Sequence, residues 1–200
     1  MQSYADLLRL RLLARHGGVW ADGTVWCATP LDHWLPLVAQ RGFFAFQWTD
    51  ADAWMIWPNV RRRVTNWFLA ATPRNRVIEG WEAQALAYWA GGRRKPHVYY
   101  WPHMLFEYLG LTDLGFRRAM AEVPGIGCYG PHLVHDHVEH GGDAAAIRAL
   151  LDSGAAPVQK LRWNWPAEKL ARAAKVIPAL VPDVPAGSAP EPAAAPAAAS

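Results

Sequence analysis

The sequence predicts an α/β protein in which a sheet is flanked by helices. Residues 3–16 are rich in leucine and arginine, which are good helix formers. Short apolar segments rich in valine, tryptophan and phenylalanine follow, and this composition is typical of strands. Residues 77–90 then return to a helical pattern. Helical and strand-like segments therefore follow one another along the chain.

The first predicted helix, residues 3–16, ends at Gly17-Gly18, because glycine adopts the left-handed conformation of a helix stop at little cost. Residues 19–27 form a short strand that is interrupted by the turn at 21–24. The next apolar segments are residues 43–48, a second strand, and residues 66–71, which suit either a third strand or the start of a helix.

The second half of the chain predicts mainly helices. The helix at 77–90 is closed by two glycines, and further helices are expected at 144–151 and 165–177. The aromatic-rich segment 98–108 is ambiguous, and the segment 124–131 is expected to be a loop because glycine and proline dominate it.

These elements make up one expected domain, residues 1–177. Residues 178–200 consist mostly of proline and alanine, so they cannot bury enough apolar surface to offset the entropy of ordering. We expect a disordered, dispensable tail there.

The high tryptophan content suits a sugar-facing cleft. Hydrophobic residues make up 52% of the chain, which is enough for a core, and twelve are tryptophans. Flat indole rings pack well on the C–H faces of sugars, although most tryptophans in proteins fill the core. The net charge of +3 comes partly from basic runs at 61–63 and 93–95. Such runs are usually solvated, but they also suit a phosphate-bearing ligand or an anionic membrane surface.

Several classes of protein are disfavoured. Cys27 and Cys128 lie far apart without a CxxC spacing, which argues against a disulfide scaffold or a cysteine-based zinc site. No recognised nucleic-acid-binding module is present, so no nucleic acid partner is expected. No stretch approaches the roughly 18 apolar residues of a spanning helix, and no signal peptide is recognised. We expect a cytoplasmic protein, with peripheral association at the inner face of the cell membrane as an option.

Charged residues near the start of the chain form a pattern. Asp6 and Arg9 are three residues apart and share one face of the predicted helix, which alone indicates a surface ion pair. Asp22 precedes a glycine, which alone indicates a turn. Together, the runs YADLLRL (residues 4–10) and GGVWADGTV (residues 17–25) resemble the signature of the capsular polysaccharide synthesis family, retaining glycosyltransferases of the GT-A fold with a DXD-like motif.

The resemblance continues in three weaker segments: TPLD (residues 29–32), TNWFLAA (residues 65–71) and VQKLRW (residues 158–163). It therefore extends from Ser3 to about Trp163. It implies a GT-A-like sheet flanked by helices and an enzyme that moves a sugar from a nucleotide-sugar donor to a glycan or lipid-linked glycan acceptor.

The resemblance also implies roles for individual residues. A diphosphate leaving group needs neutralisation, and a carboxylate is a suitable ligand for Mg²⁺ or Mn²⁺. The implied donor-sugar residues are Asp6, Arg9 and Trp20, the implied metal or diphosphate residues are Asp22 and Thr24, and further ligand contacts are Asn66 and Lys160.

Two departures from the family pattern affect these expectations. Thr24 stands where many relatives have a second aspartate, and a hydroxyl is a poorer metal ligand than a carboxylate. The signature also begins at residue 3, so the opening β–α unit that grips the nucleotide is expected to be missing. We therefore expect weak or undetectable transfer by this chain. The sequence does not indicate the donor, the acceptor, the linkage or a catalytic base.

Two alternatives remain open. One is a non-catalytic carbohydrate-binding protein or an inactive fragment, which the tryptophans permit. The other is a metallohydrolase built on the histidine-rich cluster His132, His135, Asp136, His137 and His140, since imidazole and carboxylate bind zinc. The glycosyltransferase hypothesis carries a geometric expectation. Its first helix packs beside the strand that bears Asp22, and the carboxylates of Asp6 and Asp22 lie within about 15 Å, because direct hydrogen bonds to one sugar are about 3 Å long.

Overall fold

A computed structural model describes residues 2–48 and 63–180 and confirms the α/β class. Its helices are α1 (Gln2–His16), the short 3₁₀ helix η1 (Leu31–His33), α2 (Leu35–Val38), α3 (Arg76–Ala90), α4 (Trp101–Thr112), α5 (Leu114–Ala121), α6 (Tyr129–His140), α7 (Ala144–Asp152) and α8 (Ala167–Leu180). Its strands are β1 (Gly18–Ala21), β2 (Val25–Cys27), β3 (Phe43–Gln47), β4 (Val64–Ala71) and β5 (Val158–Lys160).

The strands form two separate antiparallel sheets. One has the order β1-β4-β3, and the other pairs β2 with β5. The segment 19–27, expected to be one interrupted strand, therefore contributes to both sheets. The turn after β1 separates them, because the amide of Val25 donates to the carbonyl of Asp22 at 2.8 Å and redirects the chain.

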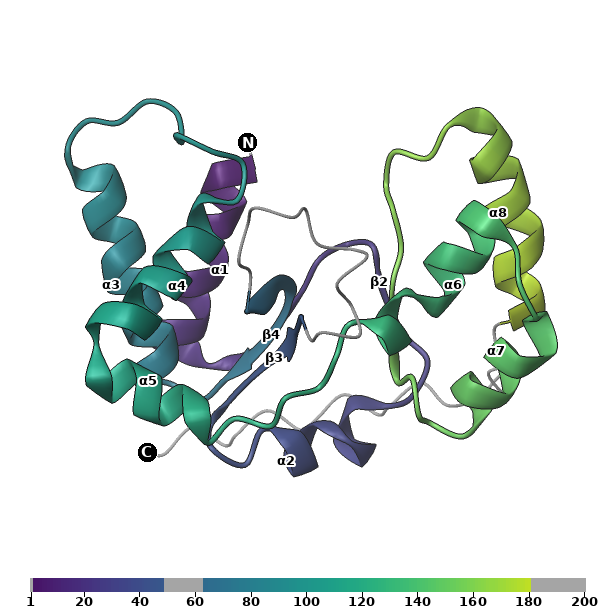
Figure 1. The fold of residues 1–200 in the computed structure, drawn as a ribbon, viewed down its shortest axis with the longest axis horizontal. Coiled ribbons are helices and arrows are strands. Elements are labelled where there is room, and N and C mark those ends of the chain that lie inside the picture. Colours follow the sequence, from purple (N-terminus) through teal and green to yellow (C-terminus); the bar gives the residue numbers. More distant parts are fainter. Residues whose placement is uncertain (1, 49–62, 181–200) are drawn as a thin grey trace, which may run out of the picture.

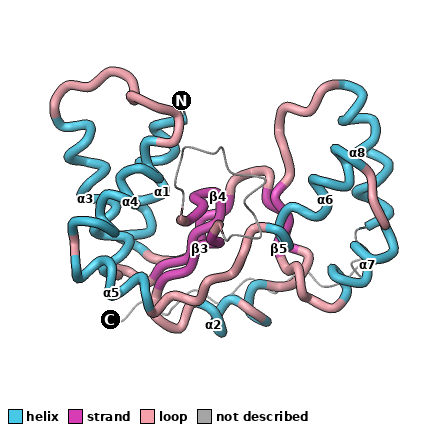
Figure 2. Tube along the Cα trace, viewed as in Figure 1, coloured by secondary structure: helices cyan, strands magenta, loops and turns pink. Residues whose placement is uncertain are grey.

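Helices cover both faces of the three-stranded sheet (Figures 1 and 2). Side chains on a strand alternate between its faces. Phe43 and Ala45 accordingly join the core formed with α1, α3, α4 and α5, whereas Phe44 and Phe46 join a second core that includes residues of η1 and α2. The helices α6, α7 and α8 enclose a third apolar cluster beside the small β2–β5 sheet.

The first helix stops where the sequence predicts. Gly17 has φ +66°, and a Cβ built there would lie 2.8 Å from the carbonyl oxygen of Ala71. A side chain at this position would be both strained and crowded. Helix α1 buries Leu10 and Leu13 in the same core as Trp81 of α3, and it leads directly into β1.

Strand β4 contains an irregularity that matters for the site. Ala45 of β3 pairs with Leu69 of β4, but Gln47 pairs with Val64. Residues 65–68 of β4 thus face the single residue Phe46 of β3. Such a bulge turns side chains away from the regular ladder and is often found next to active sites.

Some boundaries differ from the sequence-based expectations. Residues 66–71 lie in a strand. Much of the ambiguous segment 98–108 lies in α4, whose first turn contains a proline, a position where helices tolerate this residue. The expected loop 124–131 gives way to α6 at Tyr129. Helix α8 continues to Leu180, which is buried in the third apolar cluster, so ordered structure extends beyond residue 177. The remaining tail, residues 181–200, lies outside the described residues.

Candidate functional site

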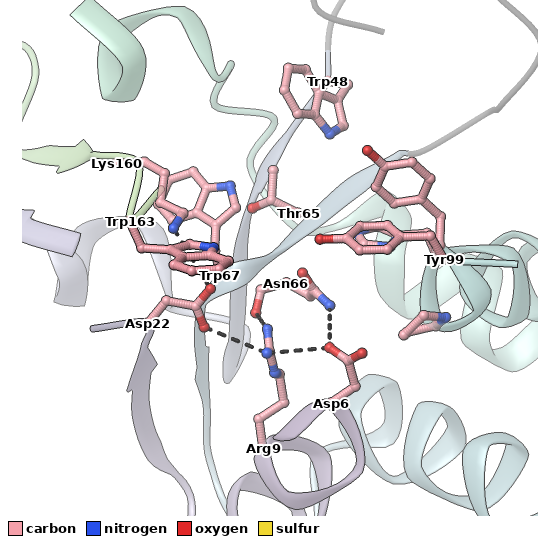
Figure 3. A pocket seen from close by; sticks show the side chains of 13 residues that line it. Asp6, Arg9, Asp22, Trp48, Thr65, Asn66, Trp67, Tyr99, Lys160 and Trp163 are labelled. Carbon is pink, nitrogen blue, oxygen red and sulfur yellow. Dashed lines mark hydrogen bonds and ion pairs between the residues drawn. The ribbon is translucent and has the colours of Figure 1, made fainter. Parts of the chain in front are cut away.

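A cavity of about 250 Å³ lies where both sheets meet α1 and the start of α4 (Figure 3). It is lined by Asp6, Arg9, Asp22, Trp48, Thr65, Asn66, Trp67, Tyr99, Tyr100, Pro102, His103, Lys160 and Trp163. Five of the seven site residues expected from the sequence are among them. The other two, Trp20 and Thr24, lie behind the wall and contact residues that form it.

The Arg9 guanidinium connects the two expected aspartates. Its Nη2 lies 3.2 Å from Oδ1 of Asp6 and 3.5 Å from Oδ1 of Asp22, and Figure 3 shows it between them. Because both carboxylates lie beside the same nitrogen atom, they are far closer than the limit of about 15 Å. The Nη1 atom donates to the carbonyl of Asn66 in the β4 bulge. Arg9 is thus a buried cation that has several partners, as buried charges require.

Asp6 is held from two sides. Besides Arg9, the side-chain amide of Asn66 donates to its Oδ1 at 3.0 Å. The pKa of Asp6 is raised to about 6, mainly because the carboxyl is buried; Arg9 opposes this rise, the nearby charge of Asp22 adds to it, and the hydrogen bond from Asn66 opposes it. Asp6 therefore titrates close to neutral pH.

We expect the Asp6→Asn variant to show a weaker pH dependence of stability than the wild type. The folded protein holds the Asp6 proton more tightly than the unfolded chain, so this contribution to stability is present below about pH 4 and is lost as the pH rises through about 6. Urea unfolding at several pH values between 4 and 7 measures the difference. Equal slopes for the two proteins over this range would contradict the raised pKa.

Trp20 supports Asp22. Its indole Nε1 donates to Oδ1 of Asp22 at 3.0 Å, and the Arg9 guanidinium carbon lies 5.1 Å from the centre of its ring. The sequence suggested that Trp20 packs near the donor sugar. In the structure it fixes two polar residues that reach the cavity, Asp22 through a hydrogen bond and Arg9 through a cation–π contact.

Lys160 reaches the same carboxylate from the other sheet. Its Nζ donates to the hydroxyl of Thr24 and lies 3.8 Å from Oδ2 of Asp22. Burial lowers the pKa of Lys160, and the charge of Asp22 opposes this effect. Thr24 therefore faces an ammonium group.

These partners make the site a poor match for Mg²⁺ or Mn²⁺. One oxygen of Asp22 faces Arg9 and Trp20, the other faces Lys160, and the Thr24 hydroxyl is already engaged. Over residues 2–48 and 63–180, no three histidine, cysteine, aspartate or glutamate residues are grouped so that they could hold a metal ion. A divalent cation needs several oxygen ligands, which this set does not supply.

The aromatic part of the wall was not predicted residue by residue. Trp163 follows β5 and is 83% exposed, and Tyr99 precedes α4 and is 63% exposed. Both line the cavity with Trp67 of the bulge. Trp67 and Trp163 belong to the segments with the weaker family resemblance. The adjacent tyrosines at 99 and 100 are conspicuous in the sequence, but only the folded chain shows that they lie at the cavity.

Thr65 has an unusual environment. It is 1% exposed and lines the cavity, yet within the described part of the chain its hydroxyl has no hydrogen-bond partner. A buried hydroxyl without a partner costs about 1–3 kcal/mol. A ligand or a water molecule in the cavity would remove this cost.

The histidine-rich cluster does not form a metal centre in the part of the chain that the structure describes. His132 is buried, and its Nδ1 lies 2.7 Å from the carbonyl oxygen of Cys128. His135 pairs with Asp136 and stacks on Trp165 with ring centres 5.9 Å apart. These contacts account for His132 and His135 through packing. In the described residues, the metallohydrolase alternative has no group of metal ligands to support it.

The fold and the cavity define an α/β protein with an aromatic-walled polar pocket built from distant segments. The family model for capsular polysaccharide synthesis proteins matches residues 1–177, and the chain belongs to this family. Neither the curated proteins nor the solved structures compared with the chain give a match, so the GT-A-like arrangement stays a prediction. Among the described helices, none is long and apolar enough to cross a membrane.

Proposed function

We propose that the protein is a glycosyltransferase that moves a sugar from a nucleotide-sugar donor to a glycan or lipid-linked glycan acceptor during synthesis of capsular or other surface polysaccharide. The observation that carries the proposal is the convergence of three distant segments. The start of α1, the β4 bulge and the end of β5 each carry part of the family resemblance, and all three line one cavity.

The chemistry of the cavity suits a sugar phosphate. Carboxylate and amide groups on Asp6 and Asn66 can hydrogen-bond to sugar hydroxyls, and exposed aromatic rings such as Trp163 can pack on a pyranose face. Arg9 and Lys160 provide cations for a leaving diphosphate.

In the overall reaction, the bond from the anomeric carbon to the diphosphate oxygen breaks. The acceptor oxygen bonds to the same carbon, and the proton of the acceptor hydroxyl is released. No step of this proposal passes through a divalent cation, since the groups around Asp22 do not suit one.

Calorimetric binding and transfer assays with a panel of UDP- and GDP-sugars test the proposal. We expect at least one nucleotide-sugar to bind and, in the presence of an oligosaccharide acceptor, to be consumed slowly, in line with the weak transfer expected from the sequence. Binding of free oligosaccharides without binding of any nucleotide-sugar would instead support the non-catalytic carbohydrate-binding alternative, which the aromatic wall also permits.

We expect Thr65→Val to weaken ligand binding without lowering stability. Valine has nearly the same shape and removes only the hydroxyl, which bonds to no other group in the described residues. The loss of one hydrogen bond to a ligand corresponds to about 0.5–1.5 kcal/mol, or up to about tenfold in Kd. Calorimetry with the donor identified in the panel, together with urea unfolding, measures both quantities.

Thr72→Val is the matched control. Thr72 follows the other end of β4, and its hydroxyl donates to the carbonyl of Gly42 at 3.4 Å. This variant should keep the affinity of the wild type. Unchanged donor affinity in Thr65→Val would contradict a ligand contact at Thr65.

A further inference from the structure

We infer that Lys160, together with Arg9, neutralises the diphosphate of the donor in place of a divalent cation, so that nucleotide binding requires no metal. The inference rests on the proposed function, and it concerns what replaces the metal that the family resemblance implies. Its basis is the arrangement of charged groups around Asp22.

The carboxylate of Asp22 is already shared between cations. Oδ1 accepts a hydrogen bond from Trp20 and lies 3.5 Å from Nη2 of Arg9, and Oδ2 lies 3.8 Å from Nζ of Lys160. A metal ion that bound here would have to displace these groups and then remain beside two positive charges. Like charges at such separations repel, more strongly in a partly buried site than in water.

The second ligand position of the motif is occupied as well. Where a metal-binding DXD sequence would offer a second carboxylate, this chain has Thr24, whose hydroxyl accepts a hydrogen bond from Lys160. A neutral hydroxyl cannot compensate for the charge of a divalent ion. It does fit an ammonium group, which donates and needs no second carboxylate.

Backbone pairing fixes Lys160 in this position. In the β2–β5 sheet, Lys160 lies opposite Val25, the residue after Thr24, and the amide of Leu161 donates to the carbonyl of Thr24 at 2.8 Å. The register of the β2–β5 pair therefore places Lys160 beside Asp22 and Thr24. Its ammonium lies 3.8 Å from Oδ2 of Asp22, which is long for an ion pair, so a phosphate oxygen can replace this contact.

Two cations lie on either side of Asp22 at this place. Asp6 and Asp22 balance Arg9 and Lys160, so the cluster has no net charge before a ligand arrives. A diphosphate can contact the two cations at once, the guanidinium through its planar fork and the ammonium as a point charge.

Calorimetric titration with UDP and with GDP, each in EDTA and in MnCl₂, tests the inference. The nucleotide that binds should do so with the same Kd in both solutions, within about twofold. Lys160→Met should weaken binding by on the order of tenfold in both, the loss of one charge-assisted contact. Lys169→Met is the matched control, because this lysine contacts Glu139 outside the cavity and its loss should leave the Kd unchanged.

Direct measurement of Mn²⁺ binding by electron paramagnetic resonance adds an independent readout. Without nucleotide, the wild type should bind no Mn²⁺. With nucleotide, the only bound Mn²⁺ should be that of the Mn²⁺–nucleotide complex itself. The double variant Thr24→Asp/Lys160→Met, which removes the ammonium and adds a carboxylate, should acquire Mn²⁺ binding. Nucleotide binding that requires Mn²⁺ in the wild type would overturn the inference alone. Failure of both nucleotides to bind in either solution would contradict the proposed function and the inference together.

Discussion

Asp22→Asn is expected to reduce glycosyl transfer by on the order of 10²–10³ while the protein remains folded. The amide keeps the shape of the side chain but removes the charge that holds Arg9 and Lys160 on either side of it. Without this charge, the two cations are no longer fixed where negative charge develops on the leaving diphosphate. The value of kcat/KM with the donor identified by the panel measures the loss, and circular dichroism checks the fold.

Asp32→Asn provides the comparison for this variant. Asp32 lies exposed in η1, within another segment of family resemblance, and does not line the cavity. It should retain the activity of the wild type. Wild-type kcat/KM in Asp22→Asn would overturn the assignment of the site.

Trp81→Ala should lower the free energy of unfolding by about 3–5 kcal/mol. Trp81 is fully buried, its ring meets that of Phe106 edge to face at 4.7 Å, and its Nε1 donates to the carbonyl of Pro102 at 2.8 Å. The variant would leave a void and would remove a hydrogen bond to the first turn of α4. Since Pro102 lines the cavity, the damage should also reach the site.

Trp163→Ala is the comparison for Trp81→Ala, and urea unfolding measures the free energy of unfolding of both variants. This tryptophan is 83% exposed, so its removal should change stability by less than about 0.5 kcal/mol while weakening ligand binding. A loss below about 1 kcal/mol in Trp81→Ala would show that α3 and α4 do not depend on this contact.

The sequence could predict those parts of the fold that depend on local signals. Helix α1 has good helix formers and a stop at Gly17, where the positive φ and the close carbonyl of Ala71 demand glycine. Strand β3 is an apolar run, FFAF, followed by Gln47, and it is buried along its whole length. The division of residues 19–27 between two sheets could not be predicted, because it depends on which distant strands, β4 and β5, each half meets.

The same distinction applies to the site. Asp6 and Arg9 could be placed together because their spacing fixes them on one helix face, and the Gly-Gly turn brings the chain back toward them at Asp22. Thr65 and Tyr99 carry no comparable local signal. Thr65 reaches the cavity through a shift in strand register, and Tyr99 through the packing of α4, and both are properties of the folded chain.

The bulge in β4 makes the cavity sensitive to the length of the chain as well as to its composition. Residues 65–68 face Phe46 alone and form a surplus between two paired stretches, with Val64 opposite Gln47 and Leu69 opposite Ala45. A substitution within this surplus would change one wall of the cavity and leave the ladder intact. A single deletion or insertion would turn every side chain on one flank to the opposite face, because strand side chains alternate. New ligand preferences can therefore arise here by exchange of residues, whereas changes in length would dismantle the sheet that presents them.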